Sequence, residues 1–168
     1  MRKLCATLFL AFSLGGCAGY QIGPVKPYYL REVKTIAVPT FKNNTLIPRI
    51  SVLITDSVIK QFQQDGTYRI AGKDDADAVL VAEIDRVDRG PLRSVRGNVL
   101  ATVEFNLVLK IRYSLVGRNG TTLANPQLVY GTTSFFVGDD ITTDERQAIP
   151  IAAEEMAVHL VSQLSEGW

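Results

Sequence analysis

The sequence predicts a two-layer α+β sandwich in which two helices pack on one face of a four- to five-stranded, mostly antiparallel sheet. Three observations support this. Residues 99–116 alternate between apolar and polar side chains, which is typical of a strand with one buried face. Two other segments repeat apolar residues at helical spacing. With 168 residues, the chain is long enough for one domain with a single core.

The domain is predicted to begin with a strand and a helix. Residues 33–41 have the β-branched and aromatic content of a strand, with Pro39 best tolerated at an edge. Residues 43–45 (Asn-Asn-Thr) supply turn and N-cap chemistry, and Pro48 suits a first helical turn. An amphipathic helix is predicted over residues 47–64. Its apolar stripe comprises Ile50, Ile54, Val58 and Phe62.

Four strand segments are predicted to follow. Asp65-Gly66 ends the helix, residues 67–71 form a short strand, and residues 73–77 form a polar turn. A strand over residues 78–87 precedes the long alternating strand, whose odd-numbered residues are expected to build the core. Asn119-Gly120 predicts a type I′ turn, and a longer loop leads to the returning strand at residues 128–137.

The C-terminal segment is predicted to be the second helix. Thr142 and Glu145 have the spacing of a capping box, and Pro150 predicts a kink or a restart. The apolar stripe comprises Ile149, Ala153, Met156, Leu160 and Leu164.

The N-terminal residues are typical of a targeting signal. Residues 4–14 are almost wholly apolar, but eleven helical residues rise only about 16 Å, too little for a hydrocarbon core of about 30 Å. Leu14-Gly15-Gly16-Cys17 looks like a bacterial lipobox, which predicts cleavage of residues 1–16 and acylation of Cys17. The alternative is an ordinary signal peptide with an incidental cysteine. Residues 17–32 are rich in Gly, Pro and aromatics and are predicted to be an extended tether, leaving residues 33–168 as one domain.

The lipobox predicts an outer-membrane location facing the periplasm. Cys5 leaves with the leader, so the mature chain cannot form an internal disulfide. Ala18, and not Asp, follows Cys17, which in enterobacterial sorting directs a lipoprotein to the outer membrane.

Composition argues against an enzyme. His159 is the only histidine, no Gly-rich phosphate loop occurs, and the acidic turn at residues 74–77 fits no EF-hand frame. No cofactor or metal is expected. The net charge of +1 and the lipid anchor also disfavour nucleic acid as a partner.

One basic stretch has the character of a binding site. Residues 86–118 hold seven Lys and Arg against two acidic residues. Guanidinium groups are suited to gripping phosphates, so an anionic glycolipid is the expected ligand. The alternative is a solvated sheet face whose cations pair with neighbouring carboxylates. The four candidate residues are Arg93 and Arg96, before the long strand, and Lys110 and Arg112, on its polar face.

The ordered set of segments resembles the outer-membrane lipopolysaccharide-assembly lipoproteins, the LptE family. The segments are the lipobox with Ala18-Gly19-Tyr20, the strand Lys34–Val38, the alternation around residues 102–107, and Ser134-Phe135-Phe136 before an acidic helix. The resemblance implies an α/β domain that plugs the large lipopolysaccharide-inserting β-barrel, helps it to assemble and binds lipopolysaccharide. It also implies a lipid-contacting role for basic residues near the turn, with Arg96 the best match by position.

The alternative function is an outer-membrane lipoprotein that regulates a periplasmic cell-wall synthase. Such a protein needs reach across the periplasm. Strand-like sequence resumes at Val33, which leaves about sixteen residues after Cys17, or at most about 50 Å of extended chain. The domain is therefore expected to stay near its own membrane.

Overall fold

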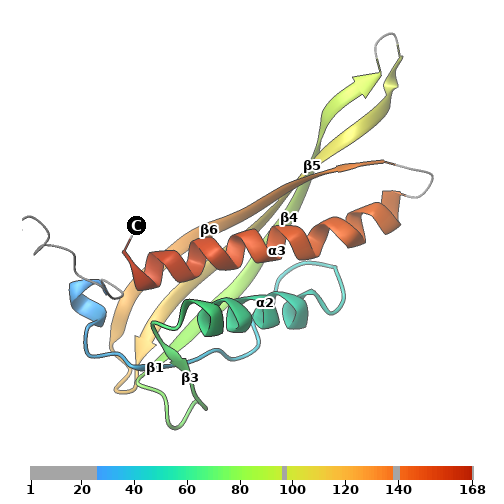
Figure 1. The fold of residues 1–168 in the computed structure, drawn as a ribbon. Helices are drawn as coiled ribbons and strands as arrows, with labels where there is room; N and C mark the ends of the chain where they lie inside the picture. The colour runs from blue at the N-terminus through green and yellow to red at the C-terminus, as the bar shows by residue number, and fades with distance from the viewer. Residues whose placement is uncertain (1–25, 96–97, 138–140, 168) are drawn as a thin grey trace, which may run out of the picture.

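The computed structural model describes residues 26–95, 98–137 and 141–167, and the predicted leader, Cys17 and Arg96 lie outside these ranges. The described chain forms a sheet with two α-helices on one face (Figure 1). The elements in chain order are η1 (Tyr28–Leu30), β1 (Thr35–Ala37), β2 (Lys42–Asn43), α2 (Ile50–Asp65), β3 (Arg69–Ile70), β4 (Ala78–Val95), β5 (Asn98–Gly117), β6 (Thr122–Phe136) and α3 (Ile141–Ser165).

The predicted α+β class is confirmed, but the sheet is larger and more mixed than expected. Within the described ranges it has six strands in the order β3-β1-β4-β5-β6, and β2 also pairs with β4. The three long strands β4, β5 and β6 are antiparallel, whereas β1, β2 and β3 pair in parallel. These short parallel pairs were not expected, because two- and three-residue strands leave little periodic signal.

The strand predicted over residues 33–41 is shortened to β1, which ends before Pro39, and β2 begins just after the predicted range. β1 pairs with β4 at Ala78 and Val79, and β2 pairs with the same strand at Glu83 and Ile84. Proline lacks the N–H that a continuous ladder needs, so the chain leaves the sheet there and rejoins it.

The long hairpin β4–β5 supplies most of the core residues that come from the sheet. On β5, Leu107, Leu109, Ile111, Tyr113 and Leu115 are all buried under the helices, which confirms the predicted inward face. The polar face is less open than predicted, since Glu104 is only 9% exposed. In β4, Ile84 pairs with Ile111 but Arg86 pairs with Lys110, so Asp85 is an extra residue in a β-bulge.

The turn between β5 and β6 is not the predicted type I′ turn. Gly120 has a φ of 81°, but Asn119 is absent from the described residues with positive φ, and a type I′ turn needs both. The hydrogen bond from Gly120 N to Gly117 O, at 2.9 Å, fits a type I turn followed by a left-handed glycine. No longer loop follows, because β6 already begins at Thr122 and accommodates Pro126 at an irregularity in register.

Both predicted helical stripes are confirmed as buried. α2 begins at Ile50, later than predicted, after Arg49 in a left-handed conformation, and Gly66 caps its end. α3 is one helix with Pro150 inside it, so the predicted restart is wrong. Because α3 begins at Ile141, Thr142 lies inside the helix and cannot be the N-cap of the predicted box.

The last part of the predicted tether packs onto the domain. Residues 28–30 form η1, and Leu30 is completely buried. The Lys26 ammonium lies 4.6 Å from the centre of the Tyr68 ring, and the Tyr68 hydroxyl donates to Leu164 O at the end of α3. The first described residues and the C-terminal end of α3 therefore meet at one end of the sheet.

Candidate functional site

The face of the sheet opposite the helices, here called the open face, holds most of the charged residues of the long strands. Strand register and alternating burial assign these side chains to it. Charged and uncharged side chains of the long strands on this face include Val79, Val81, Glu83, Asp85, Arg86 and Asp88 of β4; Val108, Lys110, Arg112, Ser114 and Val116 of β5; and Leu128, Tyr130, Thr132, Ser134 and Phe136 of β6.

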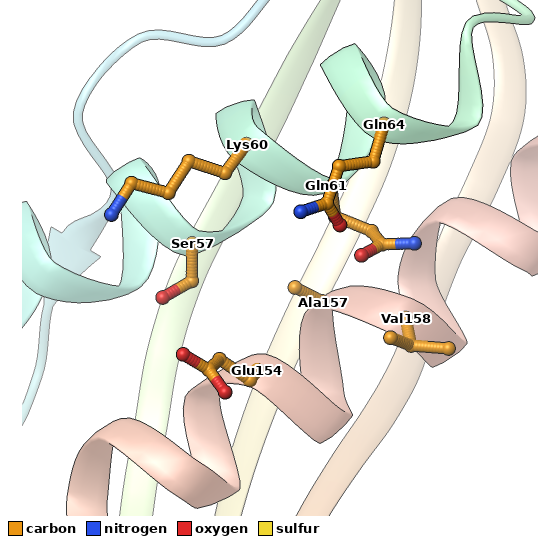
Figure 2. A pocket seen from close by; sticks show the side chains of 7 residues that line it. All are labelled: Ser57, Lys60, Gln61, Gln64, Glu154, Ala157 and Val158. Carbon is orange, nitrogen blue, oxygen red and sulfur yellow. The ribbon is translucent and has the colours of Figure 1, made fainter.

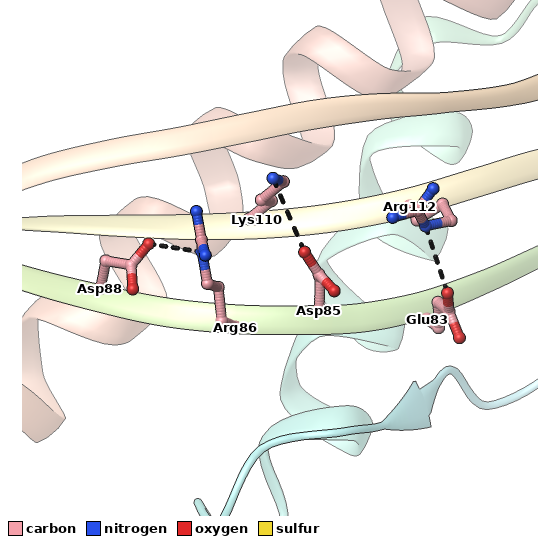
Figure 3. Close-up of polar contacts among 6 residues, drawn as sticks. All are labelled: Glu83, Asp85, Arg86, Asp88, Lys110 and Arg112. Carbon is pink, nitrogen blue, oxygen red and sulfur yellow. Dashed lines mark ion pairs between the residues drawn. The ribbon is translucent and has the colours of Figure 1, made fainter.

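Three ion pairs lie side by side across the middle of the open face (Figure 3). Arg112 Nε is 3.3 Å from Glu83 Oε1, and Lys110 Nζ is 3.7 Å from Asp85 Oδ2. Arg86 Nε is 2.7 Å from Asp88 Oδ2. We call these six residues the charge belt. Its three cations and three carboxylates sum to zero.

Beyond Phe136 the strands β4 and β5 continue without β6, and residues 93–95 and 98–103 form a projecting ribbon (Figure 1). Arg93 stands at its base with a side chain 72% exposed, and its Nε is 3.8 Å from Glu104 Oε2. Just before the ribbon, Arg89 forms an ion pair with Glu145, near the start of α3. This pair joins the sheet to the helix layer.

The structure separates Arg93 from Lys110 and Arg112, the three predicted phosphate-binding residues that it describes. Arg93 pairs with Glu104, which lies six residues from Lys110 on β5, or about 20 Å along the strand. The side chains of Lys110 and Arg112 are 17% and 48% exposed, and both have carboxylate partners. Arg96 lies outside the described residues.

The carboxylate partners Glu83 and Asp85 were missed in the sequence. Both stand in a strand that was predicted, opposite residues that were singled out. Their contact with Arg112 and Lys110 depends on how β4 is aligned with β5, and the Asp85 bulge changes that alignment. To predict these ion pairs from the sequence, the position of the bulge would have had to be known.

A second polar region lies between the two helices (Figure 2). It is a groove of about 320 Å³, lined by Ser57, Lys60, Gln61 and Gln64 of α2 and by Glu154, Ala157 and Val158 of α3. Among the described residues, no group of three or more histidine, cysteine or acidic side chains could hold a metal ion. None of the described helices has both the length and the apolar content to span a membrane.

The folded domain matches a known protein family along nearly its whole length. The model of the lipopolysaccharide-assembly family, LptE, matches residues 33–164, which include all six strands and almost all of both α-helices. The chain belongs to the LptE family. This membership identifies it as a lipopolysaccharide-assembly protein. None of the curated proteins matches the chain.

Solved structures share the fold of this LptE-family chain. A minor lipoprotein from Acinetobacter baumannii is 15% identical, with a TM-score of 0.55 over 79% of this chain and 93% of that one. A Xanthomonas campestris protein is 13% identical, with a TM-score of 0.54 over 79% and 84%. A Chlamydia trachomatis protein is 6% identical, with a TM-score of 0.55 over 79% and 96%. At these identities the likeness concerns architecture alone.

Proposed function

We propose that this chain is the lipoprotein subunit of an outer-membrane lipopolysaccharide translocon, and that it acts without catalysing a reaction. In this role it sits inside the large β-barrel that inserts lipopolysaccharide, assists assembly of that barrel and binds lipopolysaccharide. The family match over residues 33–164 carries the proposal, because it covers nearly the whole folded domain and not one local motif.

The N-terminal sequence supports the membrane-anchored part of this proposal. Cleavage after Gly16 would leave Cys17 as the acylated first residue, and residues 18–25 would connect it to the domain. Several acyl chains, each CH₂ contributing about 0.8 kcal/mol, would make the anchor effectively permanent. We propose that Ala18 then allows the lipoprotein to reach the outer membrane, where it faces the periplasm.

We assign the first contact with lipopolysaccharide phosphates to Arg93 and its neighbour Arg96. Arg93 is exposed and its contact with Glu104 is long, so its guanidinium can form new charge-assisted hydrogen bonds. Lys110 and Arg112 would first have to release Asp85 and Glu83. We therefore assign them a secondary role in phosphate binding, although the sequence predicted all four residues equally.

Depletion of the lipoprotein in its own bacterium tests the proposal. If the chain plugs the barrel and assists its assembly, depletion should reduce the amount of one large barrel protein that migrates in gels as its folded, heat-resistant form. The barrel should also co-purify with the tagged lipoprotein in mild detergent. Sensitivity to large hydrophobic antibiotics should rise as lipopolysaccharide insertion fails. A normal barrel profile together with altered peptidoglycan crosslinking would instead support the regulator of a cell-wall synthase.

A further inference from the structure

The open face has the charge properties of a surface that becomes buried against another protein. Burying an ion is costly unless a partner compensates its charge. Here that compensation is internal, because each cation of the charge belt has a carboxylate within 4 Å on the same face. A partner covering the charge belt would not need to supply counter-charges.

Apolar side chains lie around the charge belt and are incompletely covered. Val81 is 51% exposed and Tyr130 is 44% exposed, and farther along β6, opposite Glu104, Phe136 is 68% exposed. Leu128 adds a fourth apolar side chain beside Arg112, and the Lys110 ammonium lies 5.7 Å from the centre of the Tyr130 ring. Exposed aromatics gathered on one face of a sheet, next to few uncompensated charges, are typical of the core of a protein interface.

The helix layer differs in charge. α3 has one Arg, Arg146, among four carboxylates, Asp144, Glu145, Glu154 and Glu155. Its groove against α2 is lined mainly by polar side chains such as Lys60, Gln64 and Glu154. Two of these carboxylates are already engaged, since Glu145 pairs with Arg89 and Glu155 accepts from Thr132 Oγ1. Glu154 lines the groove, so a partner packed there would have to bring a counter-charge to it, whereas a partner packed on the open face would meet charges that already pair with one another.

We propose that the open face, and not the helix layer, packs against the inner wall of the β-barrel partner. This inference rests on the proposed function. The lumen of a transmembrane barrel is lined by polar side chains on extended strands. Such a wall can contact the Ser and Thr side chains of the open face, and the paired charges of the belt require no counter-charge from it. Lys110 and Arg112 then serve the protein interface, and Arg93 remains available at the base of the projecting ribbon.

Site-specific photocrosslinking in the full-length lipoprotein, in its own membranes, tests this inference. A benzophenone amino acid is placed at Tyr130 or at Val81, on the open face. The matched controls on the helix layer are Val158, 43% exposed beside 44% for Tyr130, and Val52, 55% exposed beside 51% for Val81. We expect adducts with the heat-modifiable barrel, identified by mass spectrometry, from the open-face positions at least about tenfold above those from the controls.

The outcomes distinguish the inference from the proposed function. Equal or stronger barrel adducts from Val158 and Val52 would overturn the inference and leave the plug intact. So would adducts from Tyr130 and Val81 that contain only a second copy of this chain or only lipid. Absence of barrel adducts at all four positions would overturn the inference if the barrel still co-purifies. Loss of co-purification as well would overturn the proposed function.

An exchange of charges within the belt provides a second test. Arg112→Glu places two carboxylates together where Arg112 and Glu83 now pair at 3.3 Å. We expect about a tenfold loss of barrel co-purification, since an uncompensated charge would be buried in the interface. The double variant Glu83→Arg with Arg112→Glu should restore it. Unchanged co-purification by the single variant, with an unfolding midpoint like that of the wild type, would contradict the inference.

Discussion

Asp77 and Thr35 form a reciprocal pair of hydrogen bonds between the turn before β4 and the start of β1. The Asp77 carboxylate accepts from Thr35 N at 3.0 Å and from Thr35 Oγ1 at 2.9 Å, while Asp77 N donates to Thr35 Oγ1 at 2.9 Å. Lys34 N donates to the same carboxylate oxygen at 3.0 Å. The pair fixes where β1 joins β4.

Replacing Asp77 should weaken this junction. Asp77→Ala removes the acceptor of three hydrogen bonds, and we expect a loss of about 1–2 kcal/mol in the free energy of unfolding, reduced by partial exposure to water. Urea denaturation at pH 7 measures it. Asp74→Ala, in the same turn, is the control and should stay within about 0.5 kcal/mol. Equal losses in both variants would assign the effect to the turn as a whole.

The same carboxylate should contribute to acid sensitivity. Donation from Lys34 N, from the Thr35 hydroxyl and from Thr35 N lowers the pKa of Asp77 below its ordinary value of 3.8. Its stabilisation is therefore present above the unfolded pKa and is lost as the pH falls through the lower folded pKa. Asp77→Asn should show a smaller drop in urea midpoint between pH 6 and pH 3 than the wild type. Parallel curves for the two proteins would contradict this expectation.

Gly131 should tolerate no larger residue. A Cβ at this position of β6 would lie 1.9 Å from Ala152 O and 2.7 Å from Met156 Cβ, so α3 crosses the strand in close contact. Because the obstacle is helix backbone, Gly131→Ala should cost about 3 kcal/mol or more, seen as a lowered thermal midpoint. Gly90→Ala is the matched control, since its Cβ would meet nothing within 4 Å.

Cys17→Ser should abolish lipidation. The transferase that acylates lipoboxes acts on sulfur, so the serine variant should remain uncleaved or become a soluble periplasmic species. Labelled palmitate incorporated in vivo and followed in gels measures this. Labelling of the variant at the wild-type level would show that Cys17 is not the acylated residue.

Arg93 should matter more than Lys110 and Arg112 for binding lipopolysaccharide. Arg93→Ala should lower affinity, with a difference from the wild type that shrinks at high salt because screening already weakens the native contact. Lys110→Ala and Arg112→Ala should have smaller effects, since their partners Asp85 and Glu83 already occupy them. Larger effects at Lys110 and Arg112 would contradict this assignment, and equal effects at all three residues would agree with the prediction from sequence, which did not rank them.

The sequence predicted those features that depend on local periodicity. The alternation of residues 99–116 and the stripe from Ile149 to Leu164 report directly which side chains are buried. It could not predict the whole charge belt, because Arg86 joins Asp85 on the open face only through the bulge. The close approach at Gly131 was also hidden, since it depends on where α3 crosses β6.

The described chain ends and the projecting ribbon lie at opposite ends of the domain, and the length between them can be compared with the thickness of a membrane. Lys26 lies near the C-terminal end of α3, and the ribbon projects from the opposite end (Figure 1). The 20 residues of β5 rise about 60 Å, more than the roughly 40–45 Å thickness of a bilayer with its headgroups. A domain anchored in the inner leaflet and standing upright in a barrel would therefore place the start of β5 at the far surface of the membrane.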